Sequence, residues 1–269
     1  MVVSILGCGW YGKALAVQLL QKGIVVKGSA TSVPKLDELR AVGILPYLIK
    51  FDGENELFDA TFFDGDVLII SIPPRSRSQE GGSYLNKIKS IITAAVQRNV
   101  KKVIYISSTG VYSDGNQEVN ELVMPQPDSE SGAILLEAEK RFQNQAAFAT
   151  TIIRFGGLVG PGRHPGRFFA GKTNIPNGLA PVNLIHQQDC IGITQAVIEK
   201  NAYGYLFNAC SAHHPAKADF YCKMAMRANL PVPEFINELN KWKIVSSVNL
   251  NSILNYHFGV NNWDDADLF

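Results

Sequence analysis

ILGCGWYGKALA, residues 5–16, places three glycines between a short apolar run and a stretch with helical apolar patterning. A strand, a glycine turn and a helix in this order are what a dinucleotide-binding loop requires, although glycines also occur in purely structural turns. The first glycine permits the tight turn, the second lets the backbone approach a pyrophosphate, and the third lets the helix pack close to the strand. Free amides at the helix start favour phosphate groups. The predicted contact residues are Gly7, Cys8, Gly9, Trp10, Tyr11 and Gly12.

Apolar runs alternate with helical patterns along the first part of the chain. The strand-like runs are residues 2–6, 24–28, 47–51, 66–72, 102–107 and 150–155. The helix-like stretches are residues 10–22, 34–42, 83–98 and 131–147. Several strand-like runs are apolar at consecutive positions, which is typical of parallel strands that are covered on both faces. The order therefore predicts an α/β fold with a Rossmann-type, doubly wound parallel sheet.

The chain changes character after Phe155. Residues 156–181 are rich in glycine, proline and arginine, which is typical of a long functional loop. The patterned stretches that follow are a strand at 182–186, a helix at 189–200 and a strand at 205–209. We predict a dinucleotide-binding core over residues 1–155. Residues 156–269 are expected to complete the sheet and to form a small substrate-binding lobe.

The composition excludes several classes of protein. The 269 residues carry a net charge of +1 with acidic and basic residues interspersed, which leaves no electrostatic footprint for nucleic acid or an anionic membrane. No apolar run approaches the roughly 18 residues that span a bilayer. The four cysteines are widely separated and lack zinc-site spacing, which fits a reducing compartment. We therefore expect a cytoplasmic protein that binds no nucleic acid, membrane or metal.

The second strand-like run indicates which dinucleotide the site favours. An NAD site commonly has an acidic residue at the end of this strand, where it bonds the ribose 2′-hydroxyl. Residues 24–32 read IVVKGSATS, and no Asp or Glu occurs before Lys35. The hydroxyl side chains in this segment are Ser29, Thr31 and Ser32. Together with the lysine they would tolerate a 2′-phosphate, unless they serve only the turn. We therefore predict NADP as more suitable than NAD.

Three further residues are assigned to the cofactor site. Asp52 closes the third strand-like run, where a contact to the adenine amino group and a simple turn are equally open interpretations. Ser71 and Pro73 lie at the end of the fourth strand-like run and complete the predicted cofactor contacts.

YISSTGVYSD, residues 105–114, comes directly off a strand-like run and resembles the fifth-strand motif of extended short-chain dehydrogenases/reductases. The resemblance continues through LVGPGRHPGRFFAGK (158–172), VNLIHQQD (182–189) and ACSAHHPAK (209–217), so it covers essentially the whole chain. These later motifs are similar to the YeeZ-type branch of bacterial NAD-dependent epimerase/dehydratase-like proteins. The resemblance implies a Rossmann fold with a small C-terminal substrate lobe, and it supplies no known reaction.

Proton transfer in that family uses a Ser or Thr, a Tyr, and a Lys four residues after the Tyr, which lowers the pKa of the tyrosine. The resemblance places Ser108 at the Ser/Thr position. Within PDSESGAILLEAEK (127–140) it places Ser131 at the tyrosine position and Leu135 at the lysine position. None of the nine tyrosines has a lysine four residues later. The usual acid/base pair is therefore missing.

The glycine- and proline-rich loop gathers several cationic side chains. These are Arg163, His164, Arg167 and Lys172. Such a cluster can collect a phosphate or carboxylate, although a basic loop in solvent has the same pattern. In the related family this segment faces the substrate, so we expect a small anionic substrate or product. The candidate catalytic residues are Ser108, Tyr112 and His164, of which Tyr112 has packing as the stronger alternative.

Other polar residues favour structural roles. We expect His186 to be a structural histidine and Asp189 to be the N-cap of the helix that follows it. His213 and His214 lie near Cys210, but the sequence offers no second ligand pair, so no metal is expected there.

Two functions fit these patterns. The first is an NAD(P)-dependent enzyme of the epimerase, dehydratase or reductase type with a non-standard active site. The second is a dinucleotide-binding regulatory protein without turnover. The glycine loop is common to both, the missing tyrosine and lysine favour the second, and the cationic loop favours the first. Either protein could be a homodimer.

The absence of an acid from the second strand-like run predicts that NADPH binds more tightly than NADH. Ala30→Asp should weaken NADPH binding by bringing like charge to the 2′-phosphate, at a cost of no more than a few kcal/mol after screening, and should affect NADH less. Calorimetric titration with both cofactors measures the difference. Clearly tighter binding of NADH by the parent protein would contradict the prediction.

Overall fold

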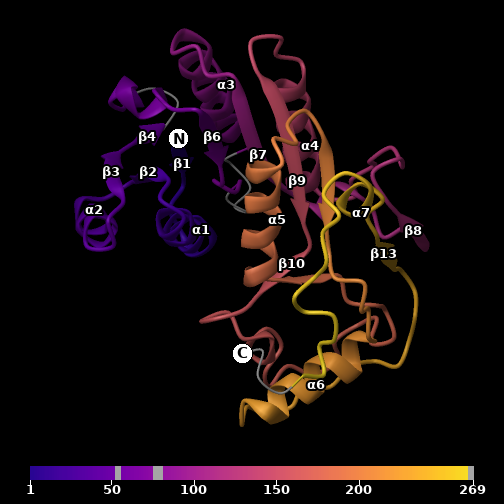
Figure 1. Ribbon diagram of the computed structural model, residues 1–269. Coiled ribbons are helices and arrows are strands. Elements are labelled where there is room, and N and C mark those ends of the chain that lie inside the picture. The colour runs from indigo at the N-terminus through magenta and orange to yellow at the C-terminus, as the bar shows by residue number, and fades with distance from the viewer. Residues whose placement is uncertain (52–55, 75–80, 266–269) are drawn as a thin grey trace.

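A seven-stranded parallel sheet forms the centre of the computed structural model, which describes residues 1–51, 56–74 and 81–265. The strands lie in the order β12-β9-β7-β6-β1-β2-β3, and every adjacent pair is parallel. Their bounds are β1 (Val2–Leu6), β2 (Val25–Ala30), β3 (Leu45–Leu48), β6 (Val67–Ile70), β7 (Lys102–Ser108), β9 (Ala149–Phe155) and β12 (Leu206–Ala209). The chain order runs one way from β1 to β3 and the other way from β1 to β12, so the direction reverses between β1 and β6 (Figure 1). The predicted doubly wound Rossmann-type sheet is confirmed.

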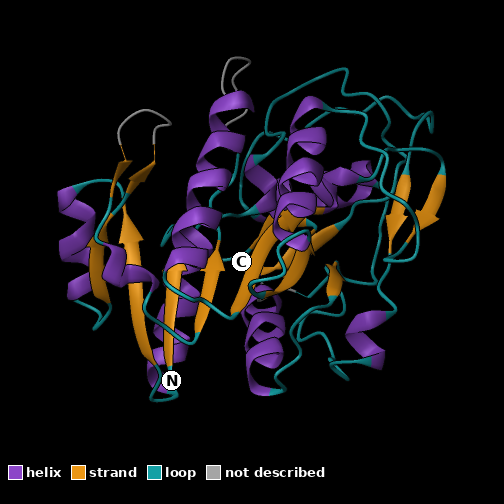
Figure 2. Cartoon of the chain, turned by 90° about the horizontal axis from the view of Figure 1, so that it is seen from above, coloured by secondary structure: helices purple, strands orange, loops and turns teal. Residues whose placement is uncertain are grey.

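Helices cover both faces of the sheet (Figure 2). Their bounds are α1 (Trp10–Gln21), α2 (Val33–Arg40), α3 (Gly81–Gln97), α4 (Glu130–Gln143), α5 (Gln187–Glu199), α6 (Lys217–Arg227) and α7 (Asn249–Ser252). Residues of α1, α2 and α5 share one buried cluster with the strands, whereas α3 and α4 belong to a second cluster. None of the described helices is long and apolar enough to cross a membrane.

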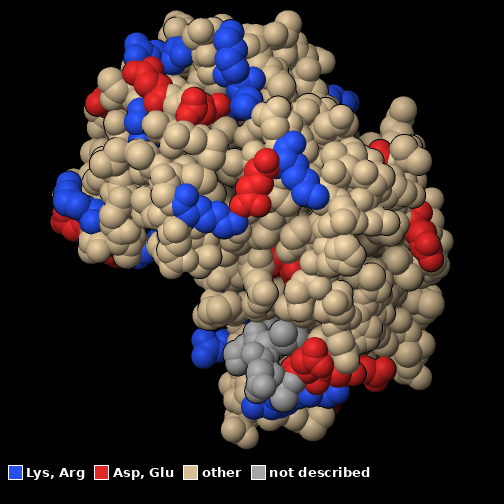
Figure 3. All heavy atoms as spheres, viewed as in Figure 1, with Lys and Arg blue, Asp and Glu red and all other residues tan. Residues whose placement is uncertain are grey.

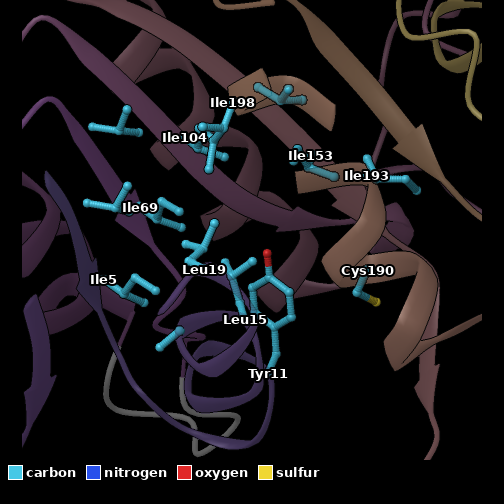
Figure 4. Packing of buried hydrophobic residues seen from close by; sticks show 14 of the residues in the cluster. Ile5, Tyr11, Leu15, Leu19, Ile69, Ile104, Ile153, Cys190, Ile193 and Ile198 are labelled. Atoms are coloured by element: carbon cyan, nitrogen blue, oxygen red, sulfur yellow. The ribbon is translucent and has the colours of Figure 1, made fainter. Parts of the chain in front are cut away.

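The consecutive apolar residues of the strands are explained by these two clusters. On β6, Val67 and Ile69 join the first cluster, whereas Leu68 and Ile70 join the second. Side chains alternate between the faces of a strand, so a strand that is covered on both faces must be apolar at every position. Figure 4 shows Leu15 of α1 within the first cluster, among isoleucines from the strands and from α5.

Several predicted boundaries differ from those of the structure. The predicted strand 47–51 is divided into β3 and the two-residue β4 (Lys50–Phe51), which pairs antiparallel with β5 (Glu56–Leu57). The helix expected at 189–200 begins at Gln187, because His186 is its N-cap and the His186 Nδ1 accepts a hydrogen bond from the Gln188 amide at 3.2 Å. The structural role expected for His186 is therefore confirmed, and the expectation that Asp189 is the N-cap is wrong.

Asp189 instead fixes the C-terminal segment to α5. Its carboxylate is 1% exposed and accepts hydrogen bonds from the Tyr256 hydroxyl at 2.9 Å, the Gly259 amide at 2.7 Å and the Val260 amide at 3.2 Å. Three donors compensate for the burial of a carboxylate. The segment is distant in sequence, which is why local sequence signals favoured a cap.

The chain beyond residue 155 contributes to two regions. It supplies β12 and α5 to the sheet layers, and α6 lies apart from them on a smaller lobe (Figure 1). Two short parallel pairs also involve this part of the chain. β10 (Gly157–Val159) pairs with β11 (Leu184–His186), and β13 (Lys243–Val245) pairs with the earlier strand β8 (Gln117–Val119). The lobe has its own buried cluster, which includes Phe220, Met224 and Trp263. The short 3-10 helices are η1 (Ala60–Phe63), η2 (Thr109–Val111) and η3 (Pro165–Arg167).

Candidate functional site

The glycine loop between β1 and α1 is held by hydrogen bonds from both neighbouring strands. The Gly7 amide donates to the Ser29 Oγ at 2.8 Å, and the Ser71 Oγ donates to the Gly7 carbonyl at 2.7 Å. Gly7 has a φ of +102°, which side chains rarely permit. A Cβ on Gly12 would lie 2.3 Å from the Gly7 carbonyl oxygen, so only glycine allows α1 to approach the loop this closely. Ser29 and Ser71, predicted as cofactor contacts, both shape the loop.

Gly9 is different from the other two glycines. It is the N-cap residue of α1, its φ of −81° suits any residue, and a Cβ built on it would meet nothing within 4 Å. The protein itself therefore does not require glycine at this position. Open space above a helix N-terminus, where amides point outward, is where a bound phosphate would lie.

Cys8, also in the loop, packs beneath the site. Its amide donates to the Ser29 carbonyl at 3.1 Å, and burial raises the pKa of the thiol to about 12. The thiol is therefore protonated and unreactive near neutral pH.

A first pocket opens from the glycine loop toward β2 and α3. Its volume is about 270 Å³. The lining residues are Leu6, Gly7, Cys8, Gly9, Ser29, Ala30, Thr31, Lys35, Ile49, Phe51, Ile72, Pro73, Tyr84 and Lys87. The charged side chains among these described residues are two lysines, and none is Asp or Glu. Thr31 and Lys35 thus lie where the sequence predicted them. Ser32, at the N-cap position of α2, is not part of this described lining. Asp52 lies outside the described residues.

A second pocket of about 360 Å³ continues from the first, with which it shares Gly7, Gly9, Ile72 and Pro73. The remaining lining residues are Trp10, Tyr11, Gly12, Ser71, Pro74, Ile106, Ser107, Ser108, Leu135, Phe155, Gly156, Leu158 and Arg163. Together the pockets follow the carboxyl ends of β1, β2, β6 and β7, across the point where the strand order reverses. Ligands of open α/β sheets bind at this position. Figure 3 shows the surface hollowed between the α1–α2 side of the molecule and the lobe that carries α6.

Ser108 faces the second pocket at the end of β7. Its Oγ accepts a hydrogen bond from the Gly110 amide at 3.1 Å and so caps η2. Leu135 on α4 lines the same pocket, whereas Ser131 is exposed one turn earlier. The position that the resemblance gave to lysine therefore faces the pocket, and it carries an apolar side chain.

Tyr112 lies outside the described lining of both pockets. Its side chain is 2% exposed, and its hydroxyl accepts from the Arg154 Nη1 at 2.6 Å and lies 3.2 Å from the Asn208 Oδ1. Burial, the largest effect, raises the pKa of this phenol. The alternative of packing fits this position better than proton transfer does.

The four cations of the loop do not converge on one point. Arg163 lines the second pocket, where its guanidinium carbon lies 5.2 Å from the centre of the Trp10 ring. The His164 Nδ1 accepts from the Gly166 amide at 3.0 Å and caps η3, and burial, followed by the charge of Arg167, lowers the pKa of this imidazole. Arg167 is exposed, and the Lys172 Nζ lies 5.4 Å from the Phe169 ring centre. Only Arg163 of the four belongs to the described pocket lining.

Sequence reasoning missed Lys87. This side chain lies on α3, the helix that follows β6, and it lines the first pocket. Its position within α3 gives no local signal, because Lys87 joins the lining residues of β2 only in the folded chain. His213 and His214 each contact the backbone of distant residues: the Trp263 amide donates to the His213 Nδ1 at 3.0 Å, and the His214 Nδ1 lies 2.9 Å from the Val182 carbonyl oxygen. Within the described ranges, no group of three or more His, Cys, Asp or Glu side chains could hold a metal ion.

Residues 7–178 match a family of domains described as NAD(P)H-binding, and this match extends from the glycine loop through the cationic loop. The chain belongs to this NAD(P)H-binding family. Its relative Protein YeeZ from Escherichia coli (strain K12) is 36% identical over 262 residues, which cover 95% of each chain. The similarity to this relative therefore extends over nearly the full length of both chains.

Solved structures of NAD-bound proteins share this fold. UDP-glucuronic acid 4-epimerase from Bacillus cereus in complex with NAD aligns with a TM-score of 0.81 at 19% identity, covering 100% of this chain and 97% of that one. A short-chain dehydrogenase/reductase superfamily protein from Agrobacterium tumefaciens with bound NAD aligns with a TM-score of 0.79 at 16% identity, covering 99% and 94%. A functionally unknown conserved protein from Silicibacter pomeroyi has a TM-score of 0.77 at 23% identity, covering 97% and 95%. This NAD(P)H-binding chain thus has the Rossmann-like fold of the epimerase and short-chain dehydrogenase/reductase superfamily.

The contrast between two glycines gives a test of the site. Gly9→Ala should weaken NADPH binding at least about tenfold, because the new methyl group would occupy the space above the helix start, and should cost less than about 1 kcal/mol of stability. Gly12→Ala should cost about 1–3 kcal/mol of stability, because its Cβ clashes with the backbone of the loop. Urea unfolding and NADPH titration of both variants measure the difference. Unchanged affinity in Gly9→Ala would place the phosphates elsewhere.

Proposed function

We propose that the protein is an NADP(H)-dependent oxidoreductase of the epimerase, dehydratase or reductase type that acts on a small anionic substrate. The observation that carries the proposal is the pair of joined pockets on the glycine loop, one lined by two lysines and the other by Ser108 and Arg163. The first has the chemistry to hold the adenosine end of NADP, and the second has room and polar groups for a nicotinamide and a substrate. Some structural neighbours carry UDP-glucuronic acid in their names, which agrees with an anionic substrate.

The preference for NADP rests on charge. Lys35 and Lys87 line the first pocket from α2 and α3, and no carboxylate is among its described lining residues. A 2′-phosphate carries negative charge, so two ammonium groups would favour it, and a carboxylate would repel it. Thr31 adds a hydroxyl donor at the end of β2.

Ser108 is the proposed group for carbonyl polarisation. Its Oγ already accepts from the Gly110 amide, which leaves its own proton to donate toward the pocket. A donor at this position would stabilise the negative charge that develops on a carbonyl oxygen during hydride addition, and removing such a donor typically costs about 10²- to 10³-fold in rate. Chemistry in this pocket would therefore depend on hydrogen bonding by Ser108, because the resemblance places Ser131 and Leu135 at the tyrosine and lysine positions.

A second candidate function is dinucleotide binding without turnover, in which cofactor occupancy regulates a partner. The observation that favours it is the chemistry of the second pocket, whose described lining includes no His, Asp, Glu or Lys. Tyr11, the one phenol there, donates toward or accepts from the Thr194 Oγ1 at 2.6 Å, and burial raises its pKa strongly. Proton transfer near neutral pH thus has few candidate groups.

The charge argument predicts a selective effect of Lys87→Ala. The variant should lose about tenfold in affinity for NADPH, equivalent to about 1.4 kcal/mol, and should bind NADH nearly as the parent does, because only the 2′-phosphate is affected. Lys89→Ala is the matched control, since this exposed lysine of α3 is not part of the described lining of the first pocket. Equal losses for the two cofactors, or an equal effect of the control, would contradict a 2′-phosphate site.

The catalytic proposal is tested by NADPH oxidation against a panel of anionic carbonyl compounds that includes 2-oxo acids, sugar phosphates and UDP-sugars. Ser108→Ala should lower the rate about 10²-fold while cofactor affinity stays near that of the parent. The exposed Ser131→Ala on α4 provides a control that should leave both quantities unchanged. His164→Ala should change turnover little, because this imidazole caps η3 and lies outside the described pocket lining. Fast turnover in Ser108→Ala would show that the reacting atoms lie elsewhere, and no turnover with any compound would favour the regulatory function.

A further inference from the structure

The turn of residues 160–163 is fastened to the first residue of the cofactor helix. The Trp10 indole Nε1 donates to the Pro161 carbonyl at 2.7 Å, and the Arg163 guanidinium carbon lies 5.2 Å from the centre of the Trp10 ring. From the other side, the Gln187 Nε2 at the start of α5 donates to the Trp10 carbonyl at 2.9 Å. Three elements that are far apart in the sequence therefore meet at one tryptophan.

The turn itself is built for a fixed shape. The Arg163 amide donates to the Gly160 carbonyl at 2.8 Å, and Gly160 and Gly162 have φ values of +144° and +73°. A Cβ on Gly160 would lie 3.0 Å from the Gln187 Cβ and 3.2 Å from the His186 Nε2, so the turn sits directly on the start of α5. This seating restricts where the Arg163 side chain can go.

The Arg163 side chain and the glycine loop line the same pocket. Its side chain is exposed, yet it lines the second pocket together with Gly9, Trp10 and the rest of the first turn of α1. It is also the one Lys or Arg side chain in the described lining of that pocket. A planar guanidinium offers paired donors to phosphate oxygens, and stacking on an indole reduces the freedom that it would lose on binding.

From this placement we infer that Arg163 and Trp10 form a clasp that holds the cofactor's diphosphate from the lobe side, opposite the amides of the glycine loop. The sequence had indicated a substrate anion as the partner of Arg163, with the cofactor held by the glycine loop alone. The clasp instead makes the 160–163 turn part of the cofactor site. This inference rests on the dinucleotide binding of the proposed function, and it does not depend on which cofactor is preferred or on turnover.

The test is the affinity of the full-length protein for NADPH and for NADH, without substrate, by calorimetry. Arg163→Ala should weaken both cofactors about tenfold and to the same extent, because the diphosphate is common to them. The loss should shrink at 0.5 M salt, since an exposed charge contact is screened. Trp10→Phe should give a smaller loss, because a phenyl ring keeps part of the stacking but cannot donate to Pro161. The double variant should be no weaker than Arg163→Ala, since both changes act through one contact.

Arg167→Ala is the matched control, because this exposed arginine follows four residues later and lies outside the described lining of the second pocket. It should leave both affinities within twofold of the parent. A parent protein that binds both cofactors, with an Arg163→Ala variant that binds them equally well, would overturn the clasp and leave the proposed function intact. A parent that binds neither cofactor would contradict the proposed function and the clasp together. Additive losses in the double variant would show that the two side chains act separately and would likewise overturn the clasp.

Discussion

The carbonyl oxygen of Gly7 lies where a side chain at residue 12 would begin, and this close approach fixes the rest of the site. With a Cβ at residue 12 only 2.3 Å from that oxygen, α1 could not start where it does. The neighbouring strands then complete the constraint, since Ser29 of β2 accepts from the Gly7 amide and Ser71 after β6 donates to its carbonyl. The amides of α1 are consequently directed over the sheet edge at the point where the strand order reverses, and both pockets open from there.

A buried ion pair supports the opposite side of the second pocket. Arg154 of β9 makes two bonds to Glu139 of α4, at 2.9 and 2.6 Å, and the Ser107 hydroxyl of β7 donates to the same carboxylate at 2.5 Å. Both charged side chains are at most 4% exposed, and breaking such a pair on one side typically costs about 3–5 kcal/mol. Through Glu139 and Arg154, these bonds join β7, β9 and α4, and a further bond from Arg154 holds Tyr112 after η2. A buried network of charged and polar side chains therefore lies beneath this end of the pocket.

The lobe is joined to the sheet by carboxylates as well as by apolar contacts. Asp189 on α5 binds the segment around residues 256–260, and Glu121 accepts from the amides of Asn208 on β12 and Val248 before α7, each at 2.9 Å. The C-terminal segment is therefore attached at two separated points, Val248 and residues 256–260.

The sequence alone determined the layered fold, because its information is local and periodic. Apolar runs of strand length, helical patterns between them and glycines at positions 7, 9 and 12 each reflect a steric or burial requirement of the chain nearby. The same local information placed Thr31 and Lys35 after the second strand, and the resemblance singled out Ser108 and Leu135; all four side chains line the two pockets. For Tyr112, a catalytic candidate, sequence reasoning had given packing as the stronger alternative, and the burial of this side chain fits that alternative.

Tertiary structure decided which of the remaining polar side chains meet. Lys87 lines the first pocket from α3, where no local pattern marks it as a ligand. Arg163 separates from Arg167 and Lys172 because the 160–163 turn contacts Trp10 and the start of α5. Asp189 binds the C-terminal segment because its three donors come from about 70 residues further along the chain. No local capping pattern extends that far. Hydrogen bonds and ion pairs depend on distances of a few ångströms between residues that are remote in sequence, and only the folded chain sets those distances.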